Sequence, residues 1–537
     1  RALLNDVNTY PLERENSRLW REYYKARIMH IEGNTESAYQ LYSQLMAGIT
    51  NPKLRAYIMA DYGEALRQLQ KHGEAIPYLE KAISIVPIDA KLTWAFHQLS
   101  EAYERLNRHS DAWAIAEKLR DYCVKNGNQY GLLVALDRLQ VLYSDQGNFR
   151  EAEKIRQQRL EILTSMQFSF PYMEMFVLGG LGFYRAMLSG RCRETEQDLI
   201  RAMQIGEELN AANLVYILRD LGYVYGMEGK YLEAEKYLMK SLELSRQLGS
   251  IVYDIDQAIA NGFLGAIQKR QGRLEEAEEK LVHSLERRKI DDVMGLPELY
   301  IWLGELAEMR SALDGQSSQE KLAQAGSHYT NAVSVVHSLQ IRHNFGVWAL
   351  TGLIRVKHAQ GDYAAIPPLL AEAEQLAQQY EYNDHLASLR LTQGHLALTP
   401  VPSPTGRGEG DGGWGEDFDA ALRYYQQALI YALRYNRFLL DEALSGRPQG
   451  TPLRPIIPEC LKRGEEGRKM LVALRDWWQT GINDIGTPRP DTISPIPEGI
   501  PLLEAERIAR EREPGDGSPQ KSVVEQIEKA LQEMGAG

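Results

Sequence analysis

The sequence has 537 residues, of which 61 are basic and 73 acidic, for a formal net charge of −12. A chain of this length is expected to form several domains unless one long repeat array replaces them. The acidic balance repels phosphate backbones, which argues against direct nucleic-acid binding, and no apolar run approaches the ~18 residues of a membrane span.

The composition is typical of a helical protein, being rich in Ala, Leu and Glu and sparse in Val and Thr. The three cysteines, Cys123, Cys192 and Cys460, are far apart and form no CxxC pair, so they predict neither a disulfide framework nor a zinc site. We therefore expect a cytoplasmic protein. The start of the sequence has no signal-peptide core. Because it begins at Arg1 instead of a methionine, we expect residues 1–17 to be the lead-in of a fragment.

A helical pair recurs along the chain at steps of about 40 residues, with longer steps before Ala325 and Ala421. The positions that open each second helix are Ala38, Ala75, Ala112, Ala152, Thr195, Ala234, Ala277, Ala325, Ile366 (or Ala364) and Ala421. Such self-similarity predicts an all-α solenoid of about ten helical hairpins.

A small residue often precedes that position by one fixed offset, inside the first helix of the pair. The residues are Ala26, Gly63, Ser100, Gly222 and Gly265. Glycine costs up to ~1 kcal/mol in a helix relative to alanine, so its recurrence predicts that the paired helices approach closely there. Turns such as "KHGEA", "EGKYLEA" and "QGRLEEA" carry a glycine, which is expected to adopt the left-handed conformation that ends the first helix.

Two stretches carry a recognisable consensus. "MADYGEALRQLQKHGEAIPYLEKAISIVP" and "LRDLGYVYGMEGKYLEAEKYLMKSL" resemble the tetratricopeptide repeat through two sets of residues: Gly63, Ala75, Leu79, Ala82 and Pro87; Leu221, Gly222, Tyr225, Ala234 and Leu238. The resemblance covers about residues 18–435 and implies a right-handed superhelix. The unit, longer than usual, is similar to the MalT-like regions of bacterial signal-transduction regulators, where a STAND-type ATPase module usually precedes the array.

Insertions and a tail interrupt this pattern. We expect a repeat array over 18–398, with extra residues around "SALDGQSSQEK", then a disordered Pro/Gly-rich insertion over 399–416. The last repeat-like helices are expected over 417–481, with a loop at 445–458. Leu471, Leu474 and Trp478 would form the apolar stripe that caps the array, and 482–537 would be a proline-rich tail with short helices.

Signatures of catalysis, cofactor binding or metal binding are missing from the sequence. His328, His337 and His343 are close in sequence, but their spacing does not put them on one helix face. We interpret them as ordinary polar or core histidines, with a metal site as the alternative. The sequence therefore predicts no enzyme; any ATPase activity would lie in an upstream domain.

The concave surface of a solenoid, lined by the first helix of each pair, is the expected binding face. By the resemblance, the inward positions are Tyr57, Glu64, Arg67, Trp94, His97, Arg105, Asp137, Tyr216, Arg219, Tyr223, Lys269 and Arg270. Aromatic residues and Arg are enriched at binding hot spots. The alternative is that most of these side chains are solvated surface residues.

These patterns favour a scaffold that binds a protein, a peptide or a small effector, as the sensor or interaction region of a larger bacterial signal-transduction or transcription-regulatory protein. The alternative is a purely structural assembly scaffold without a switch. A third hypothesis, an enzyme, would require a clustered polar pocket on the inner wall. No membrane association is predicted, and the sequence defines neither the partner nor the oligomeric state.

Overall fold

Helices are the regular elements throughout the part of the chain that the computed structural model describes. That part comprises residues 15–31, 34–46, 49–85, 88–166, 170–180, 182, 192–248, 254–313, 318–340, 343–379, 383–399, 417–435, 437–446, 455–483 and 519–535. The predicted insertion, apart from its first residue, and residues 484–518 of the predicted tail lie outside these residues.

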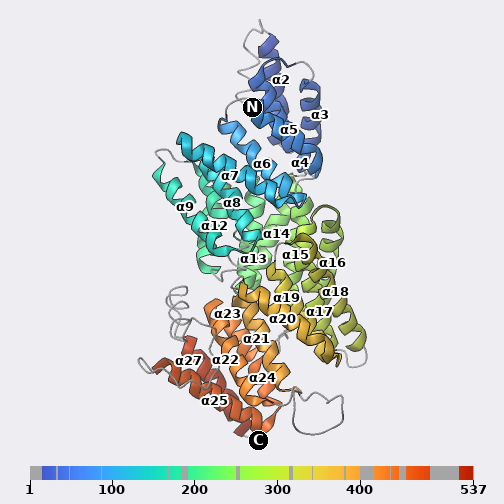
Figure 1. The fold of residues 1–537 in the computed structure, drawn as a ribbon, viewed down its shortest axis with the longest axis vertical. Coiled ribbons are helices and arrows are strands. Elements are labelled where there is room, and N and C mark those ends of the chain that lie inside the picture. The colour runs from blue at the N-terminus through green and yellow to red at the C-terminus, as the bar shows by residue number, and fades with distance from the viewer. Residues whose placement is uncertain are drawn as a thin grey trace.

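The first five hairpins form the N-terminal half of the array, at the top of Figure 1. Their helices are α2 (Glu15–Ile31) with α3 (Thr35–Met46), α4 (Pro52–Gln68) with α5 (His72–Ile85), α6 (Ala90–Arg105) with α7 (His109–Asn126), α8 (Gln129–Asp145) with α9 (Phe149–Ser165), and α10 (Pro171–Gly179) with α12 (Cys192–Leu209).

Five further hairpins follow, and each packs on the one before it. They are α13 (Leu214–Met227) with α14 (Tyr231–Leu248), α15 (Asp254–Arg270) with α16 (Leu274–Asp291), α17 (Leu296–Leu313) with α18 (Ser318–Leu339), α19 (His343–Ala359) with α20 (Ile366–Gln379), and α21 (Asn383–Ala397) with α22 (Phe418–Tyr435). The 3-10 turns η2 (Val293–Gly295) and η3 (Tyr363–Ala365) precede α17 and α20. The stack is the predicted right-handed solenoid, elongated along its helical axis (Figure 1).

The recurring small residues lie where the two helices of a hairpin touch. A Cβ added at Gly222 would lie 2.7 Å from Leu238 Cγ and 3.0 Å from the Ala234 carbonyl oxygen. In α6 the equivalent Ser100 hydroxyl donates to the Ala112 carbonyl at 3.0 Å, which is possible only at the same close approach. The packing requirement inferred from the sequence is therefore observed.

The turns follow the expected geometry with one correction. Gly229 and Gly272 have φ of 76° and 79°, the left-handed conformation that ends the first helix. In "KHGEA", however, the left-handed residue is Gln70 with φ of 62°, whereas Gly73 lies within α5. The prediction that a glycine makes this turn is wrong there, because α5 already begins at His72 and the turn comes earlier.

Two irregular units keep the repeat packing. In α20 the packing series begins at Ile366 rather than Ala364, since Ile366, Leu370 and Ala373 are buried whereas Ala364 lies in η3. The extra residues of the eighth unit extend α17 and α18, and the buried Tyr329 ring packs at the position that Gly304 leaves open.

Within the described residues, four more helices close the C-terminal end of the array: α23 (Arg437–Ser445), α24 (Ile456–Leu461), α25 (Gly464–Asn483) and α27 (Pro519–Gly535). The expected stripe of Leu471, Leu474 and Trp478 is fully buried, partly beneath α27. At the bottom of Figure 1, α27 lies against α25, so the last helix of the tail docks on its own chain.

The predicted loop over 445–458 needs correction at its end, because α24 begins at Ile456. Pro455 occupies the N-cap, where it needs no amide partner. Ile456 and Cys460 then pack into the same C-terminal core as Trp478, so burial extends helical structure into this segment.

Candidate functional site

A cavity of about 480 Å³ opens on the inner wall of the array, in the range expected of ligand sites. Its walls come from α4, α6, α8, α10, α13 and α15, the first helices of consecutive hairpins, and from the segment that joins α16 to α17. The lining contains six of the predicted binding residues: Arg67, His97, Arg105, Asp137, Tyr216 and Arg219.

On the N-terminal side, the cavity wall is a series of ion pairs between successive first helices. Arg67 of α4 donates from Nη1 to Glu101 Oε1 of α6 at 2.8 Å. Glu101 is partly buried, with 18% of its side chain exposed. Burial by itself would raise its pKa, but Arg67, Arg105 and Arg138 lower that pKa to about 2. The carboxylate is therefore ionised at neutral pH.

Asp137 of α8 is held from two sides. His97 Nε2 lies 3.1 Å from Asp137 Oδ2, and the fully buried Arg159 guanidinium lies 2.8 Å from Asp137 Oδ1. Burial opposes ionisation, but Arg159 and His97 lower the pKa of Asp137 below its ordinary value. Only 6% of Asp137 is exposed, so its carboxylate organises the wall and is not a free contact group.

The other side of the cavity has a second group of charges, centred on Arg219 of α13. Its guanidinium contacts Asp220 Oδ1 at 2.9 Å and donates to Asp256 Oδ1 of α15 at 2.8 Å. Burial is the main effect on Asp256, reinforced by Asp220 and opposed by Arg219, and it raises the pKa of this carboxyl to about 7. Asp256 therefore titrates near neutral pH.

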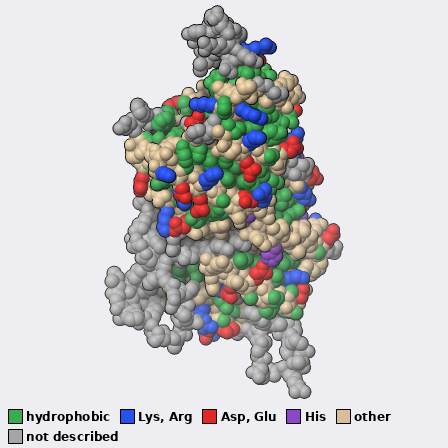
Figure 2. Space-filling view, turned by 45° about the horizontal axis from the view of Figure 1, so that its top comes forward, with side chains coloured by type: hydrophobic (Ala, Val, Ile, Leu, Met, Phe, Trp, Pro, Cys, Tyr) green, Lys and Arg blue, Asp and Glu red, His purple; other side chains and the backbone are tan. Residues whose placement is uncertain are grey.

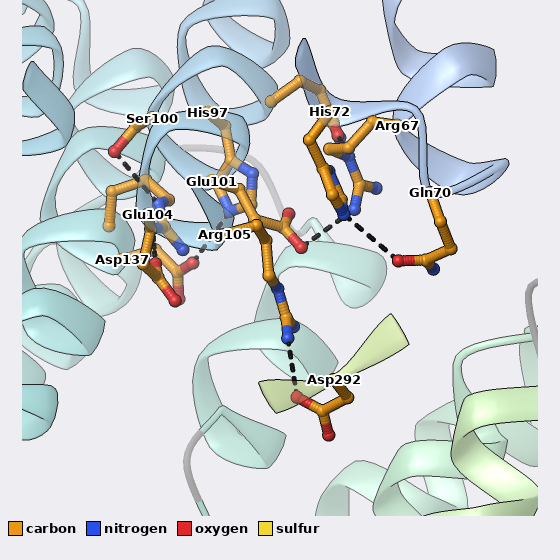
Figure 3. Close-up of polar contacts among 12 residues, drawn as sticks. Arg67, Gln70, His72, His97, Ser100, Glu101, Glu104, Arg105, Asp137 and Asp292 are labelled. Atoms are coloured by element: carbon orange, nitrogen blue, oxygen red, sulfur yellow. Dashed lines mark hydrogen bonds and ion pairs between the residues drawn. The ribbon is translucent and has the colours of Figure 1, made fainter. Parts of the chain in front are cut away.

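The two sides meet across the cavity. Arg105 of α6 donates to Asp292 at 3.2 Å, and Figure 3 shows its side chain extending from α6 towards the η2 segment. Asp292 also accepts from Arg288 Nε at 2.9 Å, and Arg288 Nη1 donates to Glu298 at 2.7 Å. This contact joins segments 187 residues apart.

The remaining predicted residues do not line this cavity. Tyr57 donates to Asp89, and the Trp94 indole donates to Tyr130 at 2.7 Å, both near the N-terminal end of the array. Glu64 is half-buried and lies in neither this cavity nor the smaller one described next.

Three predicted residues surround a smaller cavity of about 20 Å³, between α13 and α17. Tyr223 is 7% exposed and its ring lies 4.7 Å from that of Phe263, so it belongs to the core. Lys269 is buried in an ion pair with Glu305, while Arg270 donates to the Gly226 carbonyl at 3.2 Å. The expectation that Tyr223 is a contact residue conflicts with this burial, because the aromatic ring fills the space between hairpins.

Several residues of the large cavity were not anticipated: Glu101, Glu104, Arg138, Asp220, Asp256, Arg288, Asp292 and Glu298. Part of this set has a sequence signal. The pairs Arg67–Glu101, Glu104–Arg138 and Arg219–Asp256 are separated by 34, 34 and 37 residues, close to one repeat. Opposite charges one repeat apart on first helices therefore indicate a row of ion pairs along the inner wall. Arg288, Asp292 and Glu298 have no such signal, since they lie at an irregular connection.

The described residues contain no group of three or more His, Cys, Asp or Glu side chains placed to hold a metal ion. Their helices include none with the length and apolarity needed to cross a bilayer. On the face shown in Figure 2, basic and acidic side chains are interspersed and form no continuous basic surface.

Comparisons with known proteins agree with the repeat packing. The tetratricopeptide repeat family matches residues 56–88, 135–167 and 211–290, which correspond to the hairpins α4/α5, α8/α9 and α13 to α16. A comparison with curated protein sequences gives no match.

Solved structures are similar at low identity. A Rap protein complexed with competence and sporulation factor has 14% identity and a TM-score of 0.42, covering 67% of this chain and 91% of that one. Human IFIT1 with m7Gppp-AAAA has 14% identity and a TM-score of 0.44, covering 94% of each chain. A STAND protein with a tetratricopeptide repeat sensor from Pyrococcus horikoshii has 16% identity and a TM-score of 0.40, covering 64% of this chain and 54% of that one.

At such identities no ligand or activity transfers from these structures. The family matches fall on hairpins whose glycine contacts and turns have the geometry described above. This chain is a tetratricopeptide repeat protein.

Proposed function

We propose that this chain is a binding scaffold whose protein or peptide partner occupies the large cavity of the inner wall. The observation that carries the proposal is the cavity itself: about 480 Å³, lined by consecutive first helices and rich in charged side chains. A solenoid presents its concave side as an extended recognition surface. The polar wall is held by ion pairs in place before any partner arrives, which reduces the entropic cost of binding.

The proposed partner is a peptide or a protein segment in extended or helical form. A segment of this kind can enter the cavity with one or two side chains while the rest contacts neighbouring first helices. The apolar lining residues Val141, Phe176 and Ile259 provide contacts for the aliphatic part of such a side chain.

The proposal also includes the wider role implied by the long repeats, the interaction region of a larger bacterial signalling or transcription-regulatory protein in the cytoplasm. Its support is the repeat length, similar to that of MalT-like regions. An ATPase loop encoded directly upstream would agree with this role, whereas a further run of repeats would favour an assembly scaffold. The chain itself is proposed to carry no catalysis, so robust ATP turnover by the purified chain would contradict the proposal.

The direct test is selection of peptides from a display library on the immobilised chain, followed by affinity measurement on two variants. Val141→Trp places a large ring in the cavity, whereas Val282→Trp makes the same change at an exposed position of α16 outside it. We expect selected peptides to bind Val141→Trp at least about tenfold more weakly, a loss of about 1.4 kcal/mol, and Val282→Trp as tightly as wild type. Equal affinity for both variants would place the binding surface elsewhere.

A further inference from the structure

The charges that line the large cavity are not balanced. Five arginines line it: Arg67, Arg105, Arg138, Arg219 and Arg288. Eight carboxylates line it: Glu101, Glu104, Asp137, Asp145, Asp220, Asp256, Asp292 and Glu298. Arg159, behind the wall, adds one more cation through its contact with Asp137. The excess of carboxylates in a low-dielectric cavity favours a positively charged occupant and disfavours an anion.

Two deeply buried side chains of the lining have an atom without a hydrogen-bond partner among the described residues. Glu298 is 3% exposed; its Oε1 accepts from Arg288, but its Oε2 has no partner. His97 is 9% exposed and its Nδ1 has no partner. Buried polar atoms are normally paired, so two such atoms around one cavity indicate partners that a ligand would supply.

Both atoms call for a donor. An ionised carboxylate can only accept hydrogen bonds, which applies to Glu298 Oε2. The Asp137 carboxylate likewise can only accept, so His97 Nε2 carries the hydrogen of that contact, and in the neutral ring Nδ1 then presents a lone pair. A group that has several N–H donors and no acceptor, and is positively charged, matches both atoms and the charge excess.

The state of Asp256 is consistent with a missing cation. Its pKa of about 7 shows that burial and Asp220 outweigh Arg219, with further lowering by Arg105 and Tyr216. A second cation beside Asp256 would stabilise its ionised form. Binding of such a group is then accompanied by proton release from the protein near neutral pH.

We propose that the cavity binds the guanidinium or ammonium group of an Arg or Lys side chain carried by a peptide, with Glu298 and His97 as acceptors. This inference rests on the proposed function and specifies the partner as a basic peptide. The stem of the side chain packs on Phe176 and Ile259, and the carboxylates around Asp256 provide the charge complement.

The test compares single-residue probes of the same shape, one with a guanidinium group and one with a neutral urea that has fewer N–H donors and a carbonyl acceptor. Nα-acetyl-arginine amide and Nα-acetyl-citrulline amide have the same shape, but citrulline is neutral. Titrated by calorimetry against the whole chain, the arginine probe is expected to bind with a Kd of about 1 mM or tighter, and citrulline at least about tenfold more weakly. Equal affinity of the two probes, or no arginine binding at about 10 mM, would overturn the inference.

A matched pair of variants locates the site. Glu298→Gln and Glu308→Gln each neutralise a carboxylate of α17 that accepts from an arginine at 2.7 Å; Glu298 is buried and Glu308 partly buried, and only Glu298 lines the cavity. We expect Glu298→Gln to weaken the arginine probe about tenfold and Glu308→Gln to leave it unchanged. The reverse pattern overturns the assignment. If Glu298→Gln fails to fold, the comparison of arginine with citrulline on wild type still decides.

Two further arms separate this inference from its alternatives. A blocked pentapeptide with a central arginine should bind more tightly than the single-residue probe. If free spermidine binds more tightly than the pentapeptide, the occupant is a small polyamine, and the inference that a peptide carries the cation is overturned. If selected peptides are weakened by Val141→Trp but contain neither Arg nor Lys, the proposed function stands and this inference is overturned. Selected peptides indifferent to Val141→Trp would overturn both.

Discussion

The ionisation of Asp256 gives a stability prediction that the structure makes quantitative. Its pKa is raised from 3.8 to about 7 by burial, with Asp220 adding to the effect and Arg219 opposing it. The folded state therefore binds more protons than the unfolded state between these values, and stability falls as pH rises through this window. From pH 5.5 to pH 8 this group alone is expected to cost the folded state about 2 kcal/mol. Asp256→Asn, which mimics the protonated form, removes that dependence.

The assay is amide hydrogen exchange on peptides covering α13 and α15, converted to opening free energies after correction for intrinsic exchange. The local measurement is needed because long repeat arrays do not unfold in one step. The quantity compared is the difference between variant and wild type at each pH, so titrating groups common to both cancel. We expect Asp256→Asn to gain about 2 kcal/mol relative to wild type between pH 5.5 and pH 8. The same difference at both pH values would refute the reasoning, because Asp256 would then have an ordinary pKa.

Three more predictions test the packing. Gly222→Leu should destabilise the α13/α14 hairpin by about 1–3 kcal/mol, because even its Cβ would lie 2.7 Å from Leu238 Cγ. At Gly73 an added Cβ would meet nothing within 4 Å, so Gly73→Ala should instead stabilise α5 by up to about 1 kcal/mol. If hydrogen exchange shows Gly222→Leu to be the more stable of the two variants, the packing rule is contradicted. Arg105→Ala removes the contact with Asp292; because the Arg105 side chain is 35% exposed, the thermal stability of the chain should change little. The radius of gyration in small-angle scattering should increase. An unchanged radius would mean that this contact does not hold the array closed. Ile527→Asp places a charge in the fully buried core between α27 and α25, so α27 should detach from α25. The expected readout is faster proteolysis after residue 483. Unchanged proteolysis would show that α27 docks without this core.

Much of the fold could be predicted from the sequence because the residues that pack against each other within a repeat are separated by short, constant distances along the chain. Gly222, Ala234 and Leu238 lie in one hairpin, so the spacing along the chain and the contact in space carry the same information. The packing series that starts at Ile366 could not be separated from one starting at Ala364 by pattern alone, because the choice depends on where η3 ends. Segments governed by burial in the C-terminal core, such as Ile456 to Leu461, were also missed, since nothing local marks them as helical.

The cavity was only half predictable, for a related reason. First-helix positions such as Arg67, His97 and Arg219 follow from the repeat, so their inward direction could be inferred. Their pairing could not, because it depends on how far each hairpin rotates relative to the next. Asp292 reaches the cavity from a connection whose place depends on the superhelical path over several hairpins, and no local pattern encodes that path.

The contact between Arg105 and Asp292 changes how the stability of this array should be described. A solenoid is usually treated as a line of units that interact only with immediate neighbours, so that ends fray independently of the middle. Here the third hairpin touches the connection that follows the seventh, and the intervening units form a closed ring of contacts. Unfolding any unit inside that ring also breaks the contact that closes it, so this weak pair adds a small coupling between hairpins three and seven that stacking of immediate neighbours does not contain.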